Sequence, residues 1–272
     1  MLGAPSYPDP ADKFRPMSDL TGSPHSNRGT AITAVLILGI MALGAVILAT
    51  EASTEPYHID ELRQVGYYDQ SVGDVVEDSF GMEQPPLDMV TNSLVQRVIG
   101  TGDLRQRAVS VALGVGSIGL IAVLALLAGM GRWGAVAAAG TLALSPTTIS
   151  VTAYARPYAL PTFLILAFVA LTIMWLRSGG IGWAVAIAVT SAALLLSRPT
   201  EPYLFLVIAP AVLLLWQLAG RQFQWVRVVY VLGVAGATLL LVGRPILGQI
   251  CGEVDQCRGF SVSVLSQVTR LW

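Results

Sequence analysis

The run TAITAVLILGIMALGAVILAT, residues Thr30–Thr50, contains no charged side chain and decides the fold class. An α-helix rises about 1.5 Å per residue, so about 20 apolar residues cross the ~30 Å hydrocarbon core of a bilayer. The whole chain of 272 residues is 54% hydrophobic and only 12% charged, whereas soluble domains carry about 25% charged residues. The 16 Lys+Arg and 17 Asp+Glu nearly cancel, so nothing indicates a nucleic acid partner. The sequence therefore predicts a membrane protein.

Further uncharged stretches bring the predicted number of spans to seven. After Thr30–Thr50 they are Ala108–Gly131, Trp133–Ala155, Pro157–Leu176, Ser178–Ser197, Pro202–Gly220 and Val228–Gly243. Only Arg156 separates the third span from the fourth, and the two together are far too long for one crossing. Pro146, Pro157 and Pro161 are expected to break the helix there. We therefore expect an all-α polytopic membrane protein.

Charges between the spans predict the orientation. The N-terminal residues are rich in Pro, Ser and Asp and carry cations, which favours a disordered cytoplasmic tail. Counting through seven spans places Arg132 and Arg177 in the cytoplasm, as the positive-inside rule requires. The predicted division is a tail over 1–29, a transmembrane module over 30–246 that includes an outer loop over 51–107, and an outer segment over 247–272.

Both cysteines, Cys251 and Cys257, fall in the outer segment. Because the outer face of a membrane is oxidising, a small disulfide loop is one interpretation of this pair. A zinc site is less expected, since neither His25 nor His58 lies near the cysteines in sequence.

The outer loop over 51–107 is too long for a simple connector and is crowded with carboxylates. Its apolar residues recur at loosely helical spacing, which predicts short amphipathic helices on the membrane surface, with another over Leu87–Ile99. Asp60 and Glu61 follow the first span by about ten residues, so they are expected to lie near the lipid headgroups. The alternative is that this acidic helix is simply solvated.

Arginines fall at the predicted outer ends of spans, against the usual cytoplasmic placement of cations. They are Arg105, Arg107, Arg156, Arg198 and Arg244. Arginine recognises phosphate through paired hydrogen bonds, although any one of these side chains could instead snorkel or pair with the acidic loop. Carboxylates that face arginines at a membrane surface suit a reaction with a phosphate leaving group, in which a carboxylate takes a proton from an acceptor hydroxyl.

Several motifs occur in order along this face of the protein. The Asp60-Glu61 pair is followed by GMEQPPLDM at 81–89, GTGDLRQRAVSVALG at 100–114 and TAYARPYALPTF at 152–163. In order and spacing they resemble the membrane-embedded GT-C glycosyltransferases, in particular the family 39-like branch that contains protein O-mannosyltransferases and lipid A aminoarabinose transferases. The resemblance implies a GT-C transmembrane helical core.

The resemblance also implies roles for the acidic residues. Asp60 matches the catalytic carboxylate of the first outer loop, the general base toward the acceptor. Glu61 is its paired neighbour, which orients Asp60 or contacts the acceptor. Glu83 matches an acidic residue that in some relatives organises the active site or binds a divalent metal cation.

For the arginines, the resemblance implies contact with a donor phosphate. Arg107 and Arg156 match family positions at outer helix ends, where they would bind polyprenyl phosphate or support the loop. Tyr158 is expected near the same cavity. Arg198 and Arg244 are further candidates for the phosphate because they are predicted on the same face.

The expected activity is inverting sugar transfer from a polyprenyl-phosphate donor to a hydroxyl of a protein, glycan or lipid. The expected place is the outer face of a bacterial plasma membrane. Members of the family usually have more spans, so we expect a fragment of a longer enzyme or a chain that needs a partner subunit. The alternatives are a lipid-linked-sugar transporter or flippase, which an internal repeat or a charge at a span centre would favour, and a noncatalytic scaffold that uses the acidic loop for docking.

Overall fold

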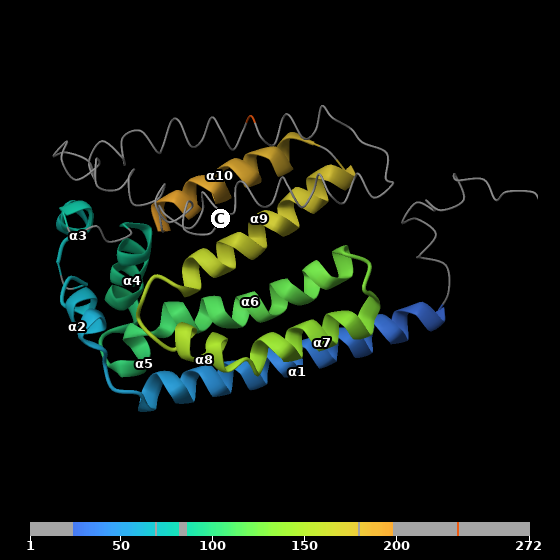
Figure 1. Ribbon diagram of the computed structural model, residues 1–272, viewed down its shortest axis with the longest axis horizontal. Coiled ribbons are helices and arrows are strands. Elements are labelled where there is room, and N and C mark those ends of the chain that lie inside the picture. Colours follow the sequence, from blue (N-terminus) through green and yellow to red (C-terminus); the bar gives the residue numbers. More distant parts are fainter. Residues whose placement is uncertain (1–23, 69, 82–85, 179, 198–232, 234–272) are drawn as a thin grey trace, which may run out of the picture.

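The computed structural model describes residues 24–68, 70–81, 86–178, 180–197 and 233, and every regular element in them is a helix (Figure 1). In chain order the helices are α1 Pro24–Thr54, α2 Ile59–Val65, α3 Val72–Gly81, α4 Pro86–Ile99, α5 Asp103–Gln106, α6 Ala108–Leu127, α7 Gly131–Ala143, α8 Pro146–Thr152, α9 Ala159–Ser178 and α10 Ile181–Ser197. The spans predicted over 202–220 and 228–243 lie outside the described residues, apart from Gly233.

Three of the described helices are long and apolar enough to cross a membrane: α6, α9 and the Gly29–Thr54 part of α1. Two further apolar segments do not meet this length as single helices. The α7–α8 pair, bent by 57°, would be one broken span or a re-entrant loop, and α10 is shorter. The break falls at Pro146, where the Ser145 hydroxyl caps α8 by accepting from the Thr148 N–H at 3.4 Å. Proline is tolerated in a first helical turn because the N–H it lacks would have no partner there.

The first helix begins earlier than the sequence indicates. The tail was expected to reach Gly29, but α1 starts at Pro24 and takes in the polar residues before the apolar run. Once a long helix has formed, each further residue adds a backbone hydrogen bond at little cost. Residues 1–23 of the predicted tail lie outside the described residues.

The long helices run side by side, and their ends gather in two places (Figure 1). At one end, which we call the basic end, Arg177 of α9 donates to the Leu127 carbonyl at the close of α6. Arg132 of α7 contacts Gly29 of α1 at this same end. At the other end, which we call the loop end, the short helices α2, α3, α4 and α5 gather (Figure 1).

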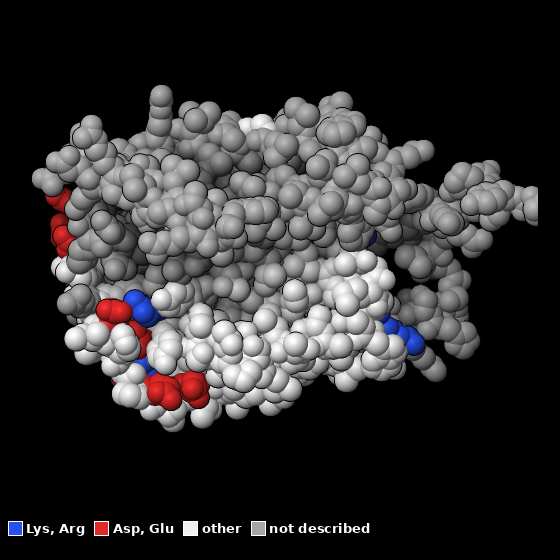
Figure 2. All heavy atoms as spheres, viewed as in Figure 1, with Lys and Arg blue, Asp and Glu red and all other residues white. Residues whose placement is uncertain are grey.

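The surface between these ends suits a bilayer. Figure 2 shows the Asp and Glu atoms at the loop end and Arg atoms at both ends, with uncharged described surface between them. On α1, Val35 and Val46 are 67% and 64% exposed, and several larger apolar neighbours are also exposed. A continuous apolar surface of this kind is uncommon in soluble monomers and is what lipid chains cover in a membrane. The described part of the chain is therefore compatible with an integral membrane protein.

Small residues let the helices approach closely near the loop end. A Cβ at Gly114 of α6 would lie 2.9 Å from Leu48 Cδ1 of α1 and 3.2 Å from Thr152 Cβ of α8. Close packing of this kind drives helix association in membranes, where the hydrophobic effect between helices is weak. It brings the end of α1, the start of α6 and the end of α8 together, and these are the elements that build the site.

Candidate active site

The centre of the loop end is an ion pair between Glu61 and Arg107, whose side chains are both 0% exposed. Arg107 Nε and Nη2 donate to the two carboxylate oxygens of Glu61, at 3.1 and 3.0 Å. The guanidinium also donates to the backbone oxygens of Ala52 at 2.7 Å, Glu55 at 2.8 Å and Pro56 at 3.3 Å. A guanidinium has five N–H groups, so these five bonds leave none for another ligand in this conformation.

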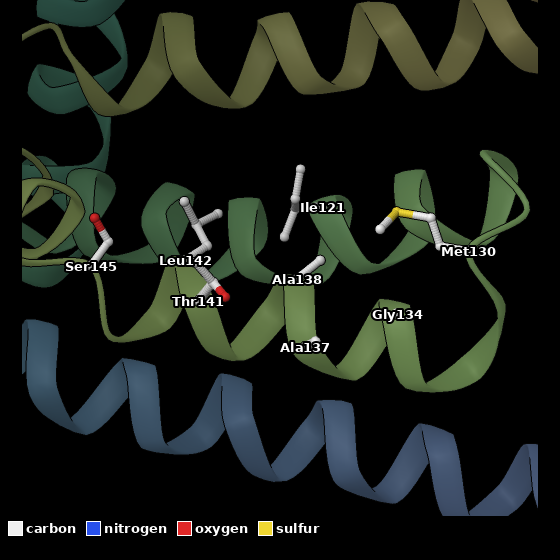
Figure 3. Close-up of a pocket in the computed structure, with 8 residues that line it drawn as sticks. All are labelled: Ile121, Met130, Gly134, Ala137, Ala138, Thr141, Leu142 and Ser145. Carbon is white, nitrogen blue, oxygen red and sulfur yellow. The ribbon is translucent and has the colours of Figure 1, made fainter.

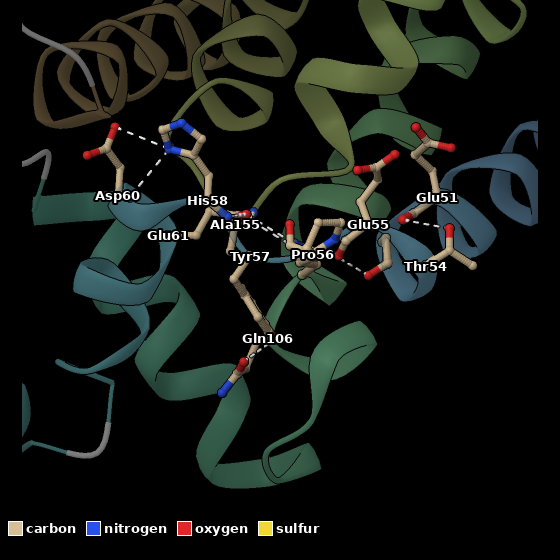
Figure 4. Close-up of polar contacts among 12 residues, drawn as sticks. Glu51, Thr54, Glu55, Pro56, Tyr57, His58, Asp60, Glu61, Gln106 and Ala155 are labelled. Atoms are coloured by element: carbon tan, nitrogen blue, oxygen red, sulfur yellow. Dashed lines mark hydrogen bonds and ion pairs between the residues drawn. The ribbon is translucent and has the colours of Figure 1, made fainter.

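Glu61 is equally occupied. Its carboxylate accepts from the backbone N–H of His58 at 2.9 Å and of Ala155 at 2.5 Å, in addition to Arg107 (Figure 4). One carboxylate thus ties α2 to the start of α6 and to the segment between α8 and α9. These contacts favour support of the loop, the second role expected of Arg107, over contact with a phosphate. The same contacts and its complete burial leave the Glu61 carboxylate without access to solvent.

The start of α2 separates the two neighbouring carboxylates. His58 is the N-cap, and Asp60 and Glu61 both lie in the first turn. Negative charge at this end of a helix interacts favourably with the helix dipole. Successive residues of an α-helix point about 100° apart around its axis. Because Glu61 turns into the buried pair, Asp60 is directed outward, and its side chain is 39% exposed.

Asp60 forms the second ion pair of the site, with Arg156. Asp60 Oδ2 lies 2.8 Å from Arg156 Nη2, and the arginine side chain is 29% exposed. The Arg156 guanidinium carbon lies 5.4 Å from the centre of the Tyr158 ring, a cation–π contact that holds it in place. The structure therefore brings together Asp60, Arg156 and Tyr158, three of the residues that the sequence assigned to the site, on the outside of the buried pair.

The remaining candidates are Arg105 and five residues that the described ranges do not include. Glu83, Arg198, Arg244, Cys251 and Cys257 lie outside the described residues. Arg105 is described and is exposed on α5, where its guanidinium lies near Gly100.

Tyr57 is a member of the site that the sequence did not single out. Its ring packs against the Arg107 guanidinium, with 4.5 Å between the guanidinium carbon and the ring centre. Its hydroxyl donates to the Gln106 side-chain oxygen (Figure 4). Burial, and after it the charge of Asp103, raises the pKa of Tyr57 to about 12. The tyrosine therefore stays protonated at ordinary pH and closes one side of the buried pair.

Beside the site, a buried polar cluster joins α4 to the residues that follow α2. Asp88 is 1% exposed and accepts from Gln64 Nε2 at 2.6 Å, and the Ser93 hydroxyl donates to the Tyr68 carbonyl at 3.1 Å. Burial raises the pKa of Asp88 to about 6, although hydrogen bonds from Gln64 and Asn92 act in the opposite direction. Burial and the charge of Asp88 raise the pKa of Tyr68 well above its ordinary value.

The described residues offer no ready metal site. Among them, no group of three or more His, Cys, Asp or Glu side chains is placed to hold an ion. A groove of about 480 Å³ runs instead along α6 and α7 (Figure 3). None of its lining residues is charged, and Ser145, the cap of α8, lies at one end of it. Such a lining suits an apolar chain rather than a charged ligand.

Neither a protein-family model nor a curated protein matches the chain. The observations that bear on its function are therefore the placement and the chemistry of its own residues.

Proposed function

We propose that the chain is a GT-C-type membrane glycosyltransferase with a core of about seven spans. It would transfer a sugar from a polyprenyl-phosphate donor to an acceptor hydroxyl. One observation carries the proposal: a carboxylate and a guanidinium, Asp60 and Arg156, meet at 2.8 Å where the apolar helices end, and both remain partly exposed. A base and an anion-binding group are the two functions that such a transfer needs.

In the proposed reaction, Asp60 accepts the proton of the acceptor hydroxyl as its oxygen attacks the anomeric carbon. The bond from that carbon to the phosphate oxygen breaks, and the electron pair leaves with the lipid phosphate. Attack from the face opposite the leaving group inverts the configuration. Asp60 Oδ2 faces both Arg156 and His58, so Oδ1 is the oxygen better placed to take the proton.

Arg156 is the group proposed to bind the phosphate. Its hydrogen-bonding capacity is only partly used by Asp60, whereas that of Arg107 is filled. The donor phosphate is a diester with one negative charge, and its two non-bridging oxygens can accept paired hydrogen bonds from a partly exposed guanidinium. A second negative charge develops on the lipid phosphate as its bond to the sugar breaks. Arg156 is therefore proposed to turn from Asp60 to the donor phosphate and to stabilise this charge.

The proposed orientation follows the cations. Arg132 and Arg177 lie at the basic end, which we assign to the cytoplasm under the positive-inside rule. The loop end then faces outward at headgroup height, where a lipid-linked donor in the outer leaflet carries its phosphate. The apolar groove along α6 and α7 offers space for an apolar chain on the same helices.

Sugar transfer in membranes containing the chain tests the proposal, with labelled polyprenyl-phosphate sugars as donors. Asp60→Asn is expected to lower the rate about a hundredfold or more, because general-base catalysis contributes about 10²- to 10⁴-fold. Glu77→Gln is the matched control, since Glu77 is an exposed carboxylate of the same outer loop. Wild-type transfer that persists in Asp60→Asn would reject Asp60 as the base. Inserted protein that transfers no sugar from any donor would favour a scaffold.

A further inference from the structure

His58 presents one ring nitrogen to two groups of the same residue. His58 Nδ1 lies 3.4 Å from the backbone nitrogen of Asp60, from which it accepts as the cap of α2. The same atom lies 3.6 Å from Asp60 Oδ2. The histidine side chain is 60% exposed, so solvent can exchange a proton with the ring.

A single nitrogen cannot serve both groups at once. Without a proton, Nδ1 can accept from the Asp60 N–H, and with a proton it can donate only to the carboxylate. The carboxylate oxygen in question, Oδ2, is the one that Arg156 Nη2 holds at 2.8 Å. The imidazole and the guanidinium are therefore alternative partners of one oxygen.

We infer that His58 is a positioning residue for Asp60, which takes over Oδ2 when Arg156 turns to the donor phosphate. This inference rests on the proposed function. In this exchange Asp60 Oδ2 is paired with Arg156 before the donor binds and with His58 afterwards. The carboxylate is thus held in place throughout, and Oδ1 stays directed at the acceptor.

Charges around His58 permit the exchange. On its own helix the imidazole faces Asp60, while Glu61 accepts from the His58 backbone and is neutralised by Arg107 from the start of α6. From the segment between α8 and α9 comes Arg156, already paired with Asp60. Among the described residues, the balance of charge at the imidazole therefore depends on whether Arg156 or His58 holds Oδ2.

Histidine NMR measures this balance directly. The chain has two histidines, so His25→Gln leaves His58 as the single imidazole signal. In that background, Arg156→Gln is expected to change the chemical shifts of the His58 ring at a fixed pH, because the imidazole then becomes the partner of Asp60 Oδ2. Adding Asp60→Asn removes that partner and should abolish the change. Polyprenyl monophosphate should act like Arg156→Gln on the His25→Gln protein and have little effect once Arg156 is replaced.

The inference is overturned if Arg156→Gln leaves the His58 ring signals unchanged, or if the change persists when Asp60→Asn is added. His58→Asn supplies a functional readout, because asparagine can still cap α2 but does not titrate. This variant is expected to transfer sugar more slowly, with the loss in kcat rather than KM and with a changed pH profile. An unchanged kcat and pH profile would also contradict the positioning role. A chain that shows the expected change in the His58 ring signals but no transfer would support the exchange and reject the proposed function.

Discussion

Replacing Arg107 by methionine is expected to cost about 3–5 kcal/mol of folding free energy, the largest loss at any single position of the site. The substitution leaves Glu61 charged in a place where its side chain is 0% exposed. It also removes the donors to three backbone oxygens, that of Ala52 in the last turn of α1 and those of Glu55 and Pro56 after it. Thermal unfolding of the detergent-purified protein measures the effect.

The matched control is Arg105→Met, two residues away, whose side chain is exposed and should change stability by less than about 0.5 kcal/mol. Adding Glu61→Gln to Arg107→Met removes the unpaired charge and is expected to restore part of the loss. Equal unfolding midpoints for Arg105→Met and Arg107→Met would show that the buried pair does not hold the loop end.

Replacing Asp88 by asparagine is expected to stabilise the α2–α4 region at pH 8 by about 3 kcal/mol. Burial raises the pKa of Asp88 from 3.8 to about 6, and each pH unit of difference between folded and unfolded chain corresponds to about 1.36 kcal/mol. Because the pKa of Asp88 is higher in the folded chain, its protonated carboxyl contributes to the stability of the wild type. This contribution is fully present below about pH 4 and is lost as the pH rises through about 6. Asparagine keeps an acceptor for Gln64 and does not ionise.

Backbone hydrogen exchange in α2 and α4 tests this, by comparing wild type with Asp88→Asn at the same pH. The two proteins should be protected alike at pH 3 and differ at pH 8, with the variant more protected. Glu77→Gln, which removes an exposed carboxylate of the same loop, should match wild type at both values. An Asp88→Asn protein that is less protected than wild type at pH 8 would contradict this account of Asp88.

Much of the helical organisation follows from sequence, because charge-free runs and prolines leave few alternatives in a bilayer. The predicted helix over Leu87–Ile99 corresponds to α4. Of the prolines expected to break the helix between the third and fourth predicted spans, Pro157 does lie between α8 and α9. The bend at Pro146 instead falls inside the predicted third span, and Pro161 lies in the first turn of α9, so these two expectations were wrong. Counting of spans also predicts that Asp60 and Arg156 lie on one face, and the resemblance adds Tyr158 to them.

Side-chain direction could not be predicted in the same way. Asp60 and Glu61 are equivalent in sequence, and only the packing of α2 against Arg107 decides which carboxylate is buried. The sequence predicts an amphipathic α4, but the structure buries its polar residues Asp88 and Asn92 while Val98 is 85% exposed. Periodicity shows that a helix has two faces, and it does not show which face the rest of the chain covers.

We propose different functions for the two adjacent carboxylates, chemistry for Asp60 and structure for Glu61. The most direct measurement is the rate of sugar transfer, together with the thermal unfolding midpoint, for Asp60→Asn and Glu61→Gln. We expect Asp60→Asn to lose transfer at a near wild-type midpoint, and Glu61→Gln to have a clearly lower midpoint because Arg107 is left unpaired. A stable Glu61→Gln protein that cannot transfer sugar, beside an active Asp60→Asn protein, would contradict the claim.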